Sequence, residues 1–183
     1  MKKSILTLLT LALFTMCATA QNKDCKYEID EVDKFTKQKL LKTRWERLSP
    51  FISSVELQAS GYEVDSTKFL RFELTVQSAR NVYVPKDGKL MILMGDGSTL
   101  TLIATEDWKG KVFDNRPNAR GEVTQYTKIF VNYPLANDDL KKLQGPTTSL
   151  RLYFINGDDR ESHIDIDFGK KRMDILSSMM KCF

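Results

Sequence analysis

Apolar and polar residues alternate along much of the chain, and this period of two is typical of β-strands with one buried face. Residues 69–76 show it most clearly, with Leu70, Phe72 and Leu74 on one side of the strand and polar residues on the other. The same alternation predicts strands in further segments: 39–48, 53–60, 90–94, 99–104, 123–133, 149–155 and 162–168. We therefore predict a mainly β protein built as an antiparallel β-sandwich, with a curved sheet or a β-barrel as the alternative.

Two turn sequences predict how some of these strands pair. The sequence GDGS at residues 95–98 separates two apolar runs and supplies the glycines that a tight hairpin turn needs. Asn156-Gly157 precedes the strand predicted at 162–168, and this dipeptide is a strong signal for a hairpin turn. Both pairs of flanking strands are therefore predicted to be antiparallel neighbours.

Two segments have helical spacing instead. Asn137 is expected to cap one short helix over residues 138–143, which Gly145-Pro146 ends. In residues 170–183 the apolar side chains recur at helical intervals: Met173, Ile175, Leu176, Met179, Met180 and Phe183. We expect this C-terminal amphipathic helix to pack on a sheet, although a stripe so rich in methionine also suits a soft binding face.

The first 20 residues have the pattern of a secretory signal peptide. Two lysines precede an apolar run, and Ala18-Thr19-Ala20 forms an A-x-A cleavage site, so cleavage is predicted before Gln21. Lipidation of Cys17 is the alternative. The apolar run is short for a retained membrane span. Residues 21–183 have the length of a single domain, and we expect them to be exported to the periplasm, the cell surface or the medium.

Charge and cysteine content refine this picture. The formal net charge is +4, and the loss of two lysines with the signal peptide leaves +2, which gives no reason to expect nucleic-acid binding. Cys25 and Cys182 remain in the predicted mature chain. An oxidising compartment favours a disulfide between them, and two free thiols are the alternative.

Two groups of motifs stand out in the sequence. The first is an acidic-F-T stretch before a T-x-W-E-x-L strand, formed by these residues: Asp33, Phe35, Thr36, Thr43, Trp45, Glu46 and Leu48. The second is Y-P-L before a short helix and an R-x-Y strand, formed by these: Tyr133, Pro134, Leu135, Leu140, Leu143, Arg151 and Tyr153. Together they resemble the motifs of a family of small exported β-rich proteins of Bacteroidetes, to which no function is assigned. Lys37 departs from the family pattern, which often has glycine there. The resemblance implies an exported β-rich fold and no catalytic residue.

The segment RESHIDIDFG, residues 160–169, contains the only histidine of the chain. On a strand, Glu161, His163, Asp165 and Asp167 share one face. Imidazole and carboxylate ligands together suit a divalent metal, and the adjacent acids at 158–159 could add oxygen ligands. The competing interpretation, which we favour, is the solvated face of a strand whose other residues, Ile164, Ile166 and Phe168, face the core.

Catalytic motifs are missing from the sequence. It has no G-x-S-x-G elbow, no H-E-x-x-H helix and no phosphate-binding glycine loop, and the one histidine limits the possible bases. A carboxylate pair of the glycosidase type stays open. We predict a non-enzymatic binding or structural accessory without a cofactor. The alternative is a metal-binding module or metal-dependent hydrolase centred on His163.

Aromatic residues suggest where a protein or glycan partner would bind. An exposed stacking platform is expected to involve some of the following residues: Tyr62, Tyr83, Trp108, Tyr126 and Phe130. The competing interpretation places Trp45 and most of these rings in the core. The polar segment from Asp107 to Glu122 is expected to be a long loop, either solvated or used in recognition.

Overall fold

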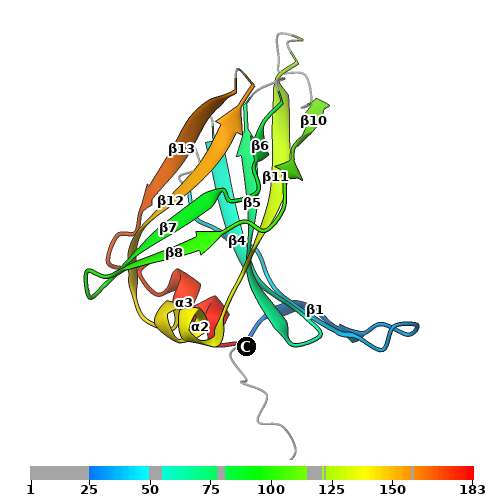
Figure 1. Ribbon diagram of the computed structural model, residues 1–183, viewed down its shortest axis with the longest axis vertical. Helices are drawn as coiled ribbons and strands as arrows, with labels where there is room; N and C mark the ends of the chain where they lie inside the picture. Colours follow the sequence, from blue (N-terminus) through cyan, green and yellow to red (C-terminus); the bar gives the residue numbers. More distant parts are fainter. Residues whose placement is uncertain (1–24, 50–54, 78–80, 115–120, 122, 158) are drawn as a thin grey trace, which may run out of the picture.

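The computed structural model describes residues 25–49, 55–77, 81–114, 121, 123–157 and 159–183 of the 183-residue chain. The predicted signal peptide and Cys17 lie outside these ranges. The described residues form two antiparallel sheets of seven and six strands and two short helices, in an open, sandwich-like arrangement (Figure 1). The prediction of a mainly β, sandwich-type fold is therefore confirmed.

The seven-stranded sheet contains both the earliest strands and the longest ones. Its strands, in spatial order, are β1 (Tyr27–Val32), β2 (Lys39–Thr43), β4 (Val55–Val64), β5 (Thr67–Val76), β11 (Gln125–Pro134) and β10 (Lys111–Asp114). The short strand β3 (Glu46–Arg47) pairs with β4 beyond the end of β2. The three longest strands of this sheet, β4, β5 and β11, are neighbours and form its centre.

The six-stranded sheet is built around β12 (Thr147–Asn156). Its strands, in order, are β8 (Thr99–Ile103), β7 (Lys89–Met94), β12, β6 (Tyr83–Val84) and β9 (Trp108–Lys109), with β13 (Arg160–Asp167) also paired to β12. β12 and β13 form a long antiparallel hairpin, in which Leu152 lies opposite Ile164.

The core lies between the two sheets, as the alternation predicts. In the seven-stranded sheet, Leu57, Leu74 and Ile129 lie side by side in one row and are fully buried. The six-stranded sheet adds the inward residues of its own strands: Leu90, Ile92, Leu100, Leu102, Leu150, Leu152 and Phe154. Val123, at the start of the strand predicted over residues 123–133, is exposed because β11 begins only at Gln125.

Both predicted hairpins form, one of them with a different turn. Met94 N–H donates to Ser98 O (2.8 Å) around a positive-φ Gly97, as expected for residues 95–98. In the β12–β13 hairpin Asn156 stays in the ladder opposite Arg160, so the turn begins only after Asn156. Asp159, just before β13, takes a positive φ (52°).

Both predicted helices form; the first begins one residue earlier than predicted, and the second is shorter than the predicted segment. Helix α2 (Asn137–Leu143) includes Asn137, and Ala136 is the cap; its N–H donates to Asp139 Oδ2 (3.2 Å). Helix α3 (Ile175–Met180) is confined to the middle of the predicted segment. Its Leu176, Met179 and Met180 are buried, so the methionine stripe packs on the core rather than forming a free surface.

The predicted disulfide between Cys25 and Cys182 is present, with 5.6 Å between the Cα atoms. Next to it, Tyr27 Oη donates to the carbonyl oxygen of Cys182 (2.7 Å), and Lys68 Nζ donates to that of Phe183 (2.6 Å). The Phe183 ring lies so close to Gly61 that a β-carbon there would collide with it. The last residues are therefore locked onto β1, β4 and β5.

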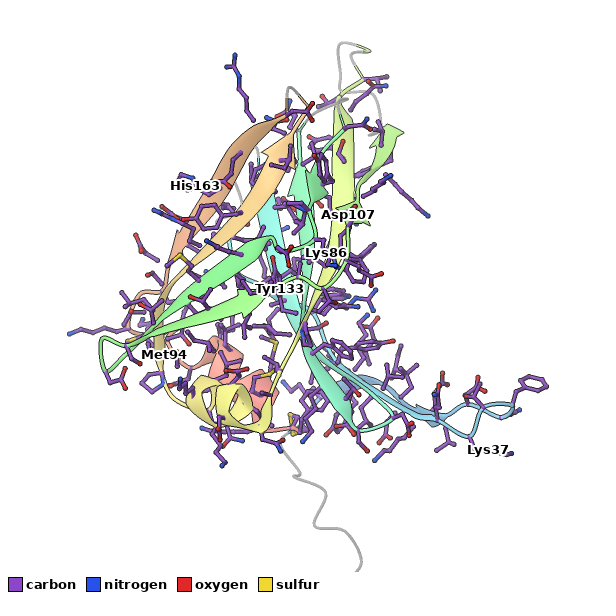
Figure 2. The ribbon with its side chains drawn as sticks, in the orientation of Figure 1. Lys37, Lys86, Met94, Asp107, Tyr133 and His163 are labelled. Carbon is purple, nitrogen blue, oxygen red and sulfur yellow. A yellow bond between two sulfur atoms is a disulfide. The ribbon has the colours of Figure 1, made fainter. Side chains whose placement is uncertain are left out.

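The hairpin of β1 and β2 projects from the body of the molecule as an arm (Figure 1). At its tip the Asp33 carboxylate accepts hydrogen bonds from the N–H groups of Phe35 (2.9 Å) and Thr36 (2.6 Å). Lys37, labelled in Figure 2, has a φ of 62°, a conformation that favours glycine. The turn thus forms although this chain has lysine at the position.

The segment predicted as a long loop after residue 107 is partly a pair of strands. β9 pairs with β6, and β10 pairs with β11, while most of the remainder lies outside the described residues. Asp107 Oδ1 accepts from the N–H of Lys86 (2.7 Å), which ties the start of this segment to the chain before β7. None of the helices in the described ranges has the length and apolar character that a membrane crossing requires.

Candidate functional site

The acidic row around His163 lies on the outer face of the six-stranded sheet. Glu161, His163, Asp165 and Asp167 are exposed, whereas Ile166 and Phe168 are buried and Ile164 packs against the core. Figure 2 shows His163 at the side of the molecule away from the seven-stranded sheet. The row therefore has the orientation expected of a solvated strand face.

The central carboxylate of this row is already engaged. Arg151, directly across on β12, donates from Nε and Nη2 to the two oxygens of Asp165, each at 2.6 Å. This hydrogen bonding lowers the pKa of Asp165 and raises that of Arg151. His163 Nε2 lies 3.8 Å from Asp165 Oδ2, and its ring packs near that of Tyr153. No group of three metal-ligating side chains occurs among the described residues.

The outer face of the seven-stranded sheet is different, because aromatic rings cover it. The register places the alternate residues of β4, β5 and β11 that do not face the core on this outer side. Together with their neighbours they form what we call the aromatic face, which has six rings: Trp45, Tyr62, Phe69, Phe113, Tyr126 and Phe130.

The rings of the aromatic face contact one another across strands. Trp45, in the connection between β2 and β3, lies with its ring centroid 6.0 Å from that of Phe130 on β11. Because β4 and β5 separate these elements in the sheet, the two side chains must lean toward each other over the outer face. Phe113 and Tyr126 stack at 5.7 Å farther along. The rings thus form cross-strand pairs rather than isolated exposed residues.

Cations are placed over these rings. Lys42 Nζ lies 4.7 Å from the Trp45 ring and also pairs with Glu28 (2.9 Å). The Arg71 guanidinium lies between two rings, 5.1 Å from that of Tyr62 and 5.3 Å from that of Phe130. Cations over aromatic faces are favourable, most of all where water is partly excluded.

A row of three polar side chains crosses the middle of the aromatic face. Ser60, Arg71 and Asn132 lie directly opposite one another on β4, β5 and β11, and we call them the central polar row. Ser60 Oγ, Arg71 Nε and Asn132 Oδ1 are buried, and none of them has a hydrogen-bond partner among the residues that the structure describes. Such atoms are uncommon in folded proteins, because losing water without a new partner costs free energy. Three such atoms in one row identify a part of the sheet in which the described residues supply too few hydrogen-bond partners.

The remaining buried polar atoms without partners do not gather in this way. Tyr133 lies on the core side of β11, and burial raises the pKa of its hydroxyl. Trp108 Nε1 and Thr147 Oγ1 belong to the six-stranded sheet and the core around it. None of these three adjoins the aromatic face.

Of the residues suggested for an aromatic platform, three lie on the aromatic face: Tyr62, Tyr126 and Phe130. Trp108 pairs with Val84 and packs against the core, and Tyr83 lies on the other sheet opposite Ile155. Trp45, for which a core position was the alternative, lies on the aromatic face against Phe130, because the chain breaks between β2 and β3.

A cleft of about 350 Å³ lies beside helix α3 and the disulfide. Its lining includes the cations Lys26, Arg44 and Lys171. Arg172, also on its wall, donates to the carbonyl oxygens of Arg47 and Leu48 and so joins the segment before α3 to β3. The cleft is therefore built at least partly for packing.

Comparison with protein-family models, with curated proteins and with solved structures finds no match for this chain. The site is therefore defined by the geometry of this molecule alone.

Proposed function

We propose that the protein is an exported, non-enzymatic binding protein whose binding surface is the aromatic face of the seven-stranded sheet. The observation that carries this proposal is the central polar row, three buried polar atoms that have no hydrogen-bond partner among the described residues, on a face that also carries paired rings. Binding sites commonly combine apolar and aromatic surface with a few polar groups that orient the ligand. The aromatic face has both parts, and it lies outside the core.

The proposal is tested by retention of polysaccharides and peptides on an array, with the purified chain of residues 21–183. Phe130→Ala removes an exposed ring of the aromatic face (38% exposed) and should abolish or strongly weaken whatever binding the wild type shows. Tyr153→Ala is the matched control, since it removes a partly exposed ring from β12 on the other sheet. Equal losses in both variants, or no ligand retained by the wild type, would contradict the proposal.

Export is tested separately, by mass spectrometry of the protein from a bacterial envelope fraction. Cleavage before Gln21 predicts a chain that begins at this residue. An acylated N-terminal Cys17 would instead show a lipoprotein. The Cys25–Cys182 disulfide supports an oxidising compartment, in which such bonds persist.

A further inference from the structure

Arg71 holds its charge in the middle of the aromatic face without a carboxylate. Within the described part of the chain it contacts the rings of Tyr62 and Phe130, and its Nε has no hydrogen-bond acceptor. The side chain is only partly exposed, so bulk water satisfies it incompletely. A guanidinium in this position is suited to a planar anion, because it can donate two parallel hydrogen bonds.

The same protein shows how an arginine on a strand is satisfied internally. Arg151 has Asp165 directly opposite, and Nε and Nη2 hold both carboxylate oxygens. The residues directly opposite Arg71 are Ser60 and Asn132, neither of which carries a charge. Arg71 therefore lacks the carboxylate that Arg151 has, because an amide takes the position of the acceptor on the neighbouring strand.

Three carboxylates of the seven-stranded sheet are each paired with another cation. Glu73 pairs with Lys128 (2.6 Å), Glu56 with Arg47 (3.3 Å) and Glu28 with Lys42 (2.9 Å). Arg71 is thus a positive charge in excess at the centre of the aromatic face, which favours an anionic ligand.

The position of the site on a sheet face, rather than at a sheet edge, narrows the class of ligand. The backbone N–H and C=O groups of β5 are committed to ladders with β4 and β11, so an extended peptide cannot add to them as a further strand. Recognition must therefore use side chains alone: rings that stack and polar atoms that bind hydroxyl or carboxylate groups. Sugar rings with hydroxyl and carboxylate substituents offer all of these.

From these observations, and on the basis of the proposed function, we infer that the aromatic face binds an acidic oligosaccharide. One uronic acid carboxylate accepts from the Arg71 guanidinium, and sugar rings stack on Trp45 and Phe130.

The direct test is calorimetry with oligosaccharides of galacturonate, alginate and hyaluronan, each paired with its neutral, carboxyl-reduced form. The wild type should bind at least one acidic form about tenfold or more tightly than its neutral form, as expected for charge-assisted hydrogen bonds to one guanidinium. Arg71→Gln should remove this difference, and Arg71→Lys should restore only part of it, since an ammonium group lacks the planar donor pair.

Asn132→Asp gives a second test, because it places a carboxylate opposite Arg71 as Asp165 stands opposite Arg151. This internal carboxylate should compete with the ligand and lower the affinity for the acidic form about as much as Arg71→Gln, without loss of folding. Asp165→Asn, on the other sheet, is the control and should leave the affinity unchanged.

Three outcomes would overturn the inference. The first is equal affinity for acidic and neutral forms, or an Arg71→Gln variant that binds like the wild type. The second is binding of a glutamate-rich peptide at the aromatic face with none of the oligosaccharides. The third is no binding of any of these uronate probes. If Phe130→Ala still abolishes binding of a neutral glycan or of a peptide, the proposed function stands and only the acidic-glycan inference fails.

Discussion

The outer faces of the two sheets differ in how far their polar groups are satisfied. On the six-stranded sheet the acidic row contains a histidine and three carboxylates, yet its central carboxylate is held by Arg151. On the seven-stranded sheet the central polar row is chemically plainer, but Ser60, Arg71 and Asn132 each have a buried atom without a partner. Residue types alone are therefore a poor guide to a binding site. The decisive property is whether the groups already have partners within the chain.

The largest effect is expected from removing the disulfide, which joins the edge of the seven-stranded sheet to the end of α3. Cys25→Ser with Cys182→Ser should lower the free energy of unfolding by about 2–5 kcal/mol, because the bond closes a very long loop. Urea denaturation of the variant beside the oxidised wild type measures this loss.

The same double cysteine variant also tests whether the disulfide stabilises the seven-stranded sheet more than the six-stranded sheet. Hydrogen exchange should accelerate in β1, β2 and residues 175–183, which the bond and the Tyr27 contact hold together, and change little in the β12–β13 hairpin. An equal acceleration in β12 and β13 would show that the aromatic face does not depend on this lock more than the other face does.

The next effect is expected from the rings that cover the central polar row. Trp45→Ala should lower the free energy of unfolding by about 1–3 kcal/mol, because it removes a partly buried ring that contacts Phe130 and Lys42. Arg151→Ala, on the opposite face, should change stability little, since exposed ion pairs are screened by water. Urea unfolding of both variants checks the contrast, and a larger loss for Arg151→Ala would reverse it.

Alternation along the chain reveals which residues face the core, and this is why the fold class and most inward residues could be predicted. The period of two alone was enough to predict that Leu70, Phe72 and Leu74 are buried. The same pattern identified the acidic row as the outer side of a strand, because Ile166 and Phe168 occupy the buried side.

Register and strand order are set by contacts between distant segments, and alternation carries no information on them. Ser60, Arg71 and Asn132 lie in one row only because β4, β5 and β11 are neighbours. Their positions in the sequence do not indicate that these strands pair. Trp45 reaches the aromatic face because the chain breaks between β2 and β3, which the even spacing of residues 39–48 does not indicate. The disulfide was predictable from the count of cysteines and the expected compartment.

Two buried hydroxyl groups, one without a hydrogen-bond partner and one with, allow the free-energy cost of a missing partner to be measured. Ser60→Ala should leave stability unchanged or raise it by up to about 1 kcal/mol, because Ser60 Oγ is buried without a hydrogen bond. Thr43→Val should lower it by about 1–2 kcal/mol, because Thr43 Oγ1 accepts from the N–H of Gly61 (2.8 Å). Thermal unfolding of the two variants decides the matter, and equal losses would mean that Ser60 is satisfied in solution.

The smallest effect concerns pH and compares the two arginines directly. Arg151 lowers the pKa of Asp165 in the folded protein, so the ionised pair stabilises the fold above the ordinary aspartate pKa of 3.8. This contribution is lost as the pH falls through the lowered pKa, and Arg151→Gln should remove it. A carboxyl titration followed by NMR should accordingly move to higher pH for Asp165 in Arg151→Gln. The carboxyl introduced by Asn132→Asp should titrate below the ordinary value only while Arg71 is present. If its titration is the same in the Asn132→Asp/Arg71→Gln double variant, Arg71 does not present its guanidinium to the neighbouring strand, and the parallel between the two arginines fails.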